Sequence, residues 1–126
     1  MSRIALIRCE KNEDRCPLTG CFQCLDEKKE GFAHYTDAAL VGVFTCKCPG
    51  DKAVALAKIL KSKGAEVIHF CTCTFATKTG NGWDMTKGGF CSRIDEIIDR
   101  VHQETDLSCV KGSAHLPAGY TADILV

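Results

Sequence analysis

Four short stretches of the chain are rich in apolar residues and are bounded by polar, turn-forming segments. They are residues 3–8, 39–45, 65–70 and 107–110. The first alternates little, which is typical of a strand buried on both faces in a parallel sheet. We therefore predict four strands at these positions. The apolar tail at 124–126 fits either an edge strand or a frayed end.

Helical periodicity appears between the predicted strands. Its clearest instance is Ile94, Ile97, Ile98 and Val101, which follow the i, i+3, i+4, i+7 spacing of one helix face. This pattern predicts a third helix that opens at Cys91-Ser92 and follows a long loop.

The two earlier helices are predicted from weaker patterns. A first helix is expected over residues 22–35, with its solvated side at 26–30 and an apolar face made of Phe22, Leu25 and Phe32. A second is expected over 53–63, with Asp51 as N-cap and Gly64 just past its end. The apolar stripe of the second helix is Ala53, Leu56, Ala57 and Leu60.

Strands that alternate with helices favour right-handed βαβ units and a mainly parallel sheet. We therefore predict a single α/β domain over residues 1–126. Its expected form is a small sheet of about four to five strands with helices on both faces, a flavodoxin-like or Rossmann-like three-layer sandwich. Residues 71–90 are expected to form a long loop, which in a small domain is usually functional or mobile.

Composition excludes several classes of partner. The chain has 126 residues, is 45% hydrophobic and balances 16 basic against 16 acidic side chains. Nothing in this balance indicates binding to nucleic acid or to a membrane surface. No apolar run is long enough to span a bilayer, and the start of the sequence lacks the features of a signal peptide. We therefore expect a cytoplasmic protein.

The cysteine content changes this picture. Ten cysteines in 126 residues would suggest a disulfide scaffold in a short secreted chain. In a reducing compartment the same content indicates metal binding or thiol chemistry instead.

Most of these cysteines stand where a parallel sheet would gather them. The C-terminal ends of parallel strands lie along one edge, and ligands bind outside that edge. The side chains that directly follow predicted strands are Cys9, Cys46, Cys48, Cys71, Cys73 and His115. We therefore predict that they meet in a thiolate site.

Further cysteines lie in polar loops and at predicted helix starts, where a buried cysteine has no structural need. They are Cys16, Cys21, Cys24 and Cys91. Cys21 and Cys24 form a Cys-x-x-Cys pair at a helix start, where free N–H groups stabilise thiolate. Cys109 lies within a strand and is interpreted as a core residue. The remaining histidines, His34, His69 and His102, are interpreted as structural or exposed.

Thiolates are soft ligands that select zinc, copper(I) or iron–sulfur clusters. In the two Cys-x-Cys pairs, an extended backbone would place the side chains roughly 6.6 Å apart at about 3.3 Å per residue. That spread suits thiolates on different irons of one cluster or on neighbouring metals. A single tetrahedral zinc needs closer ligands.

Several segments resemble the CGGC-domain proteins, and the similarity spans roughly residues 3–115. The opening segment from Ile4 to Glu10 carries it, with Glu13-Asp14 and Cys16-Pro17. The later matching segments are Phe44-Thr45-Cys46, Cys48-Pro49-Gly50, Lys52-Ala53-Val54-Ala55, Gly64 to His69 and Gly112-Ser113-Ala114-His115. The resemblance implies metal binding through cysteines and a histidine, without an established reaction. The ligands that it implies are Cys9, Cys16, Cys46, Cys48, Cys91 and His115.

The chain departs from the family pattern in two places. The Cys-Gly-Gly-Cys motif is replaced by Cys46-Lys47-Cys48, one residue shorter, and we expect Lys47 to reach over the metal and offset thiolate charge. Around Cys91 only the cysteine of a Pro-Cys-Pro-His-like segment is kept. The resemblance does not imply Cys21, Cys24 or Cys73 as ligands, and they are candidate ligands from the pattern of residues alone.

The sequence therefore predicts an iron–sulfur protein with a redox or electron-transfer role, or one that acts on a small-molecule substrate beneath the 74–90 loop. Up to nine thiolates, leaving Cys109 aside, would serve two 4Fe-4S clusters or one larger cluster. One alternative is a zinc-binding structural or regulatory domain. A further alternative is a metal-free thiol enzyme that uses Cys21 and Cys24. The pattern names no catalytic residue, redox partner or oligomeric state.

Overall fold

The computed structural model describes residues 2–126, and at its centre lies a five-stranded sheet in the order β2-β1-β3-β6-β7. All neighbouring strands are parallel except β6 and β7, which are antiparallel. The strands are β1 (Ser2–Cys9), β2 (Ala38–Cys46), β3 (Val67–Phe70), β6 (Ser108–Lys111) and β7 (Asp123–Leu125). In chain order these strands follow the flavodoxin-like 2-1-3-4-5 arrangement, with the last strand reversed.

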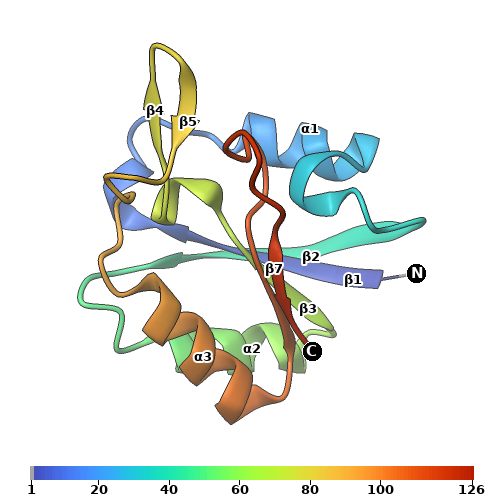
Figure 1. Ribbon diagram of the computed structural model, residues 1–126. Helices are drawn as coiled ribbons and strands as arrows, with labels where there is room; N and C mark the ends of the chain where they lie inside the picture. The colour runs from blue at the N-terminus through green and yellow to red at the C-terminus, as the bar shows by residue number, and fades with distance from the viewer. Residues whose placement is uncertain (1) are drawn as a thin grey trace.

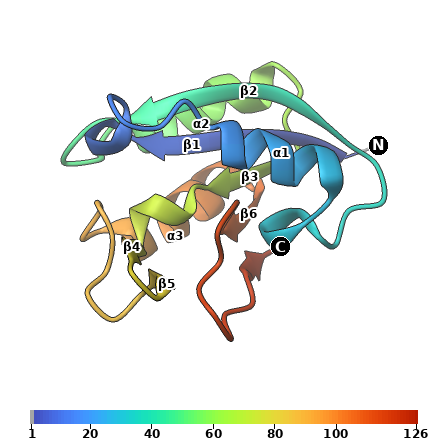
Figure 2. The same cartoon turned by 90° about the horizontal axis from the view of Figure 1, so that it is seen from above.

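Helices cover both faces of this sheet, as predicted. Figure 1 shows α1 on one face and α2 with α3 on the other, and Figure 2 shows the same layers from above. The helices are α1 (Thr19–Glu27), α2 (Ala53–Ser62) and α3 (Ile94–Thr105). Short 3-10 turns occur at η1 (Glu10–Asn12), η2 (Glu30–Phe32) and η3 (Thr72–Thr74).

Strand β1 divides the core into two layers because successive side chains of a strand point to opposite faces. Ile4 and Leu6 pack on the α1 side, with Leu25 of α1. Ala5 and Ile7 pack on the side of α2 and α3. All four of these β1 side chains are at most 1% exposed, which confirms that β1 is buried on both faces.

The first helix differs from the prediction of residues 22–35. It starts at Thr19 and ends at Glu27, because Lys28 adopts a left-handed conformation (φ 57°) that stops the helix. Phe22 is 40% exposed and faces solvent. Phe32 is fully buried, but it belongs to η2 and reaches the core from a separate turn.

The second helix starts as a backbone turn without a side-chain cap. Lys52 occupies the N-cap position, so the prediction of Asp51 as N-cap was wrong. Asp51 instead forms an ion pair with Arg93, with 3.5 Å between Oδ1 and Nη1. At the other end Gly64 has φ +104°, which confirms it as the residue that ends the helix.

Residues 71–90 are more ordered than the predicted loop. After η3 they form an antiparallel hairpin of β4 (Thr77–Thr79) and β5 (Gly82–Asp84). The third helix starts at Ile94, three residues later than predicted, and its apolar face is buried as expected. None of the helices in the described part of the chain has the length and apolar character needed to cross a bilayer.

His69 has a structural role, which is one of the two interpretations, structural or exposed, given from the sequence. It is fully buried, and its Nδ1 and Nε2 lie 2.8 Å from the Gly112 carbonyl and 2.7 Å from the Tyr35 hydroxyl. The carbonyl only accepts, so Nδ1 donates to it and Nε2 of the neutral ring accepts from Tyr35. Burial lowers the pKa of His69 to about 4. Cys109 is also fully buried in the core.

Candidate functional site

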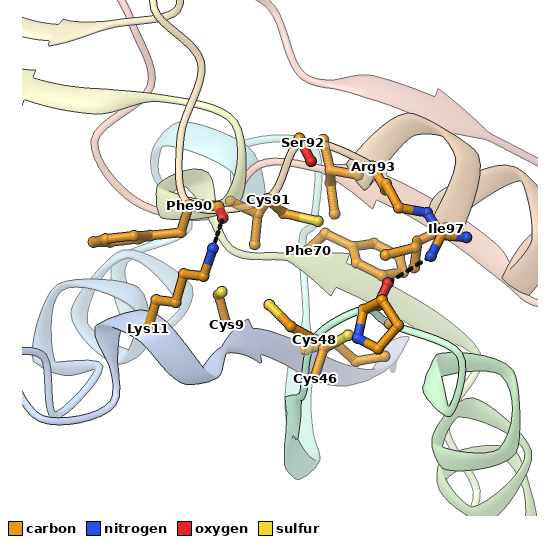
Figure 3. A pocket seen from close by; sticks show the side chains of 15 residues that line it. Cys9, Lys11, Cys46, Cys48, Phe70, Phe90, Cys91, Ser92, Arg93 and Ile97 are labelled. Atoms are coloured by element: carbon orange, nitrogen blue, oxygen red, sulfur yellow. Dashed lines mark hydrogen bonds between the residues drawn. The ribbon is translucent and has the colours of Figure 1, made fainter.

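The C-terminal edge of the sheet carries a cavity that we call the four-cysteine cavity. Its volume is about 210 Å³, and its lining includes the side chains of Cys9, Cys46, Cys48 and Cys91. Figure 3 shows these four side chains around one shared space. The thiols come from three segments: the end of β1, the end of β2 with its following turn, and the segment before α3.

The strands and turns fix three of these thiols. Cys9 and Cys46 are register partners at the last positions of the β1–β2 pair. The backbone N–H of Cys48 donates to Glu10 Oε2 at 2.5 Å, which holds the turn after β2 against η1. Gly50 closes this turn at φ +94°, where a Cβ would stand 2.5 Å from Cδ1 of Ile97.

Cys91 reaches the same cavity from a different part of the chain. Its backbone N–H donates to the Thr74 carbonyl, and Phe90 donates to the Cys73 carbonyl. Gly89 permits this close approach, because a Cβ there would stand 2.4 Å from the Cys73 oxygen. The segment before α3 is therefore docked on η3, and Cys91 faces β1 and β2.

The thiols of this cavity oppose ionisation in one another. Burial is the largest cause that raises the pKa of Cys46 to about 11, and the nearby Cys91, Cys9 and Cys48 act in the same direction. Burial also raises the pKa of Cys9. Thiolates crowded in this way need a positive partner. The cations that line the cavity are Lys11 and Arg93, whereas Lys47 is exposed and lines a different cavity, contrary to the expectation that it reaches over the metal.

The four thiols surround a space and do not converge on a point. Among residues 2–126, no three His, Cys, Asp or Glu side chains are grouped closely enough to hold one metal ion. The cavity is several times the volume of about 30 Å³ that one water molecule occupies in the liquid. Four thiols around such a space are soft ligands of the kind that hold thiophilic metals.

A second cavity, which we call the Cys21–Cys71 cavity, lies beside α1 and the β4–β5 hairpin. Its volume is about 580 Å³. Its lining includes further candidate residues of the sequence analysis, namely Cys16, Cys21, Cys71, Cys73 and His115. The Sγ atoms of Cys21 and Cys71 are 4.0 Å apart, and Cys21 Sγ is 3.1 Å from Ser113 Oγ.

The rim of this second cavity is aromatic. The rings of Trp83 and His115 are stacked, with centroids 5.3 Å apart and planes 4° from parallel. A Cβ on Gly20 would stand 2.7 Å from His115 Nε2, so α1 leaves room for this ring. Both Trp83 and His115 line the Cys21–Cys71 cavity and do not line the four-cysteine cavity.

The thiols of the second cavity differ strongly in acidity. Cys71 lies close to Cys21 and shares a hydrogen bond with it, which lowers the pKa of Cys21 to about 6 although burial opposes this. The same contact and complete burial raise the pKa of Cys71. Burial also raises the pKa of Cys73 to about 11.

The structure thus gathers the predicted residues at one edge of the sheet but divides them between two cavities. The division follows the helices: Cys21 comes from α1 on one face, and Cys91 precedes α3 on the other. Cys24 lines neither cavity, and burial raises its pKa. Sequence reasoning named Ser113 only as part of a matching segment, although its position just after β6 was a signal for a role at this edge.

Comparison with known proteins agrees with these features. The family model described as the CGGC domain matches residues 3–114. The chain belongs to the CGGC domain family. The matched range contains every cysteine of the chain and ends one residue before His115.

A curated relative supports the same assignment. The chain is 33% identical over 120 residues to a protein from Methanocaldococcus jannaschii that bears the name uncharacterized protein MJ0582. The alignment covers 88% of this chain and 85% of that protein. No solved structure matches the chain. The comparisons therefore place this cysteine-rich chain in the CGGC domain family, and they name no reaction.

Proposed function

We propose that this CGGC domain protein binds an iron–sulfur cluster in the four-cysteine cavity and serves in electron transfer or redox chemistry. The ligands would be Cys9, Cys46, Cys48 and Cys91. One observation carries the proposal: four thiols from three separate segments face one cavity at the carboxyl edge of a parallel sheet. When bound, the cluster would supply a one-electron redox centre.

The donor set supports a cluster over other metal centres. Four cysteines are the usual ligands of a 4Fe-4S cluster, and thiolates select against magnesium and calcium. The cavity wall also includes the apolar side chains Ile7, Phe70, Ile94 and Ile97. Such a wall limits water at the cluster, which is one of the factors that set its reduction potential.

Two contacts hold the cavity together and would orient the ligands. Lys11 of η1 lines the cavity, and its Nζ donates to the Phe90 carbonyl at 3.4 Å, which joins η1 to the Cys91 segment. Arg93 Nη1 donates to the Pro49 carbonyl at 2.8 Å and joins the start of α3 to the turn after Cys48. Both cations line the cavity in which thiolate charge would gather.

A zinc site with the same ligands is the second candidate, because zinc also binds four cysteines. The spread of the thiols disfavours it, since a single zinc ion requires them within one tetrahedron of about 2.3 Å bonds. The two candidates differ in colour and in response to dithionite, because zinc has no redox chemistry.

The test is anaerobic purification, followed by reconstitution with iron and sulfide, an absorption spectrum, and iron, sulfide and zinc analysis. We expect a brown protein whose visible absorption bleaches with dithionite. Single Cys→Ser changes at any of the four ligands should reduce the bound iron, whereas the matched control Cys24→Ser should retain it. A colourless protein without iron and sulfide, or one that holds a single zinc per chain, would overturn the proposal.

A further inference from the structure

The Cys21–Cys71 cavity holds a thiol pair that the proposed cluster does not use. Neither sulfur lines the four-cysteine cavity. The sequence pattern indicated Cys21 and Cys24 as a redox pair, but Cys24 lies outside the cavity and Cys71 is the close neighbour at 4.0 Å. Fifty positions separate the two cysteines in the chain, so only the fold brings them together.

Hydrogen bonds distinguish the two members of the pair. Ser113 Oγ accepts the Thr72 backbone N–H at 3.3 Å, so its hydroxyl hydrogen is free to be donated to Cys21 Sγ at 3.1 Å. The backbone of Ala114 adds a further hydrogen bond to Cys21. Cys71 Sγ is fully buried behind it. Cys21 is therefore the thiolate of the pair, and Cys71 is the thiol that supports it.

The half-buried cation Arg8 also favours the charged form of Cys21. The Arg8 guanidinium donates through Nη2 to the carbonyls of Asn12 and Cys16, at 3.0 and 2.7 Å. Its Nε is buried and has no hydrogen-bond partner among the described residues. The positive charge of Arg8 contributes to the lowered pKa of Cys21. Both carbonyls that hold it belong to residues of the cavity wall.

The cavity in front of the pair suits a small anionic ligand. Its volume of about 580 Å³ lies in the range of small-molecule sites, about 300–1,000 Å³. Of the described residues that line it, none is Asp or Glu, whereas Arg15 and Lys78 are cationic. The rings of Trp83 and Phe90 provide apolar wall, and the Arg15 guanidinium lies 5.7 Å from the Phe90 ring centre.

We propose that the Cys21–Cys71 cavity is a thiol–disulfide exchange site for small disulfides that carry carboxylates. Cys21 thiolate attacks one sulfur of the disulfide, a mixed disulfide forms, and the first thiolate leaves. Cys71 then passes its proton to solvent or to the departing thiolate and attacks Cys21 Sγ, which releases the second thiolate. Two protein thiols are oxidised to one disulfide, and the small disulfide is reduced to two thiols.

The distance between the sulfurs allows this second step with little rearrangement. A disulfide requires an S–S bond of about 2.05 Å, so the two atoms must approach by about 2 Å from their present 4.0 Å. Ser113 contacts the nucleophilic sulfur of Cys21, and Trp83 forms part of the cavity wall that would contact the ligand.

The test uses anaerobically prepared protein with its metal content intact and dithiobis(nitrobenzoate), an anionic aromatic disulfide whose release of coloured thiolate is measured. In the fast phase we expect two equivalents of coloured thiolate per chain and, by peptide mass spectrometry, a Cys21–Cys71 disulfide. Cys71→Ser should release one equivalent and leave a stable mixed disulfide on Cys21. Cys21→Ser should lose the fast phase, and the matched control Cys24→Ser should keep it.

Two further measurements address the acidity and the charge of the site. Ser113→Ala should raise the pH at which the fast phase is half-maximal, because the Cys21 thiolate loses one hydrogen bond. Each probe's rate is divided by its rate with free cysteine, because the two disulfides also differ in the acidity of the leaving thiol. On this scale the cationic disulfide cystamine should react about tenfold more slowly than the anionic probe, and Arg15→Gln with Lys78→Gln should remove this preference.

Other outcomes would overturn the inference. They are a fast phase carried by another cysteine, a mapped Cys21–Cys24 disulfide, equal rates with both probes after division by their rates with free cysteine, or loss of iron in the Cys21→Ser/Cys71→Ser variant, which would make the pair a cluster ligand. The readouts also keep the two proposals separate. A protein without iron that still forms the Cys21–Cys71 disulfide would refute the cluster and retain the exchange site.

Discussion

The two cavities use the same amino acid in two different environments. In the four-cysteine cavity the thiols surround an apolar-walled space, and burial together with the other cysteines raises the pKa values of Cys9 and Cys46. In the Cys21–Cys71 cavity two sulfurs touch, and hydrogen bonds favour charge on one of them. The two environments differ in which effect dominates: hydrogen bonds lower the pKa of Cys21 despite its burial, whereas burial outweighs every other effect at Cys9 and Cys46.

The largest change is expected in bound iron when two of the proposed cluster ligands are removed. Cys46→Ser combined with Cys91→Ser should abolish iron binding, because half of the ligand set is lost. The same variant should keep the fast reaction of Cys21 with an anionic disulfide. Iron analysis and mapping of the modified cysteine check both halves. Loss of both properties in a folded protein would show that the cavities act as one site.

The next effect is a pH dependence of stability caused by His69, whose Nδ1 contacts the Gly112 carbonyl next to Ser113. His69 is neutral in the folded protein, with a pKa of about 4, against about 6.5 when unfolded. As the pH falls, His69 therefore takes up a proton in the unfolded chain before it does so in the folded protein. The free energy of unfolding falls by about 3 kcal/mol between pH 6.5 and 4. Chemical denaturation at several pH values should show this decline, and His69→Gln should flatten it. An unchanged slope in the variant would contradict the assignment of the decline to His69.

A smaller effect is expected in the turn that shapes the four-cysteine cavity. Gly50→Ala places a methyl group against Ile97 at a positive φ, which should cost about 2 kcal/mol of unfolding free energy. Because Cys46 Sγ is 3.7 Å from the added Cβ, the cluster spectrum should change as well. The added change Ile97→Val removes the clashing Cδ1 atom and should recover part of the loss. A strictly additive double variant would argue against this contact.

The smallest effect is expected at the rim of the second cavity. Gly20→Ala brings a Cβ to 2.7 Å from His115 Nε2, and the exposed imidazole has room to move away. The stability should change by less than about 1 kcal/mol, as for most exposed sites. Tryptophan fluorescence should change because Trp83 loses its stacked partner, while the cluster spectrum stays constant. A changed cluster spectrum would show that the rim reaches the first cavity.

The sequence predicted much of the fold correctly. Apolar stretches predicted the strands, and the spacing of Ile94, Ile97, Ile98 and Val101 predicted the third helix. The first helix was misplaced because a thin apolar face gave no sign that Lys28 would turn left-handed. The hairpin in residues 71–90 was missed because its strands are three residues each, too short to show a period.

The candidate site was predicted in position but not in arrangement. We predicted one shared edge for Cys9, Cys46 and Cys71 because each stands at the end of a predicted strand. The three strands are parallel, so their C-terminal ends do lie at the same edge. The split into two cavities depended on the opposite faces that α1 and α3 cover. The close approach of Cys21 to Cys71 also depended on tertiary packing, which no spacing in the chain records.

The most direct test of two separate thiol sites is the iron and sulfide content of the reconstituted protein, measured together with its absorption spectrum. We predict about four irons and four sulfides per chain, the content of one cluster with four-cysteine ligation. We also predict that Cys21→Ser/Cys71→Ser leaves both the content and the spectrum unchanged. A content of about eight irons that falls by half in that variant, or a colourless protein without iron, would contradict the account.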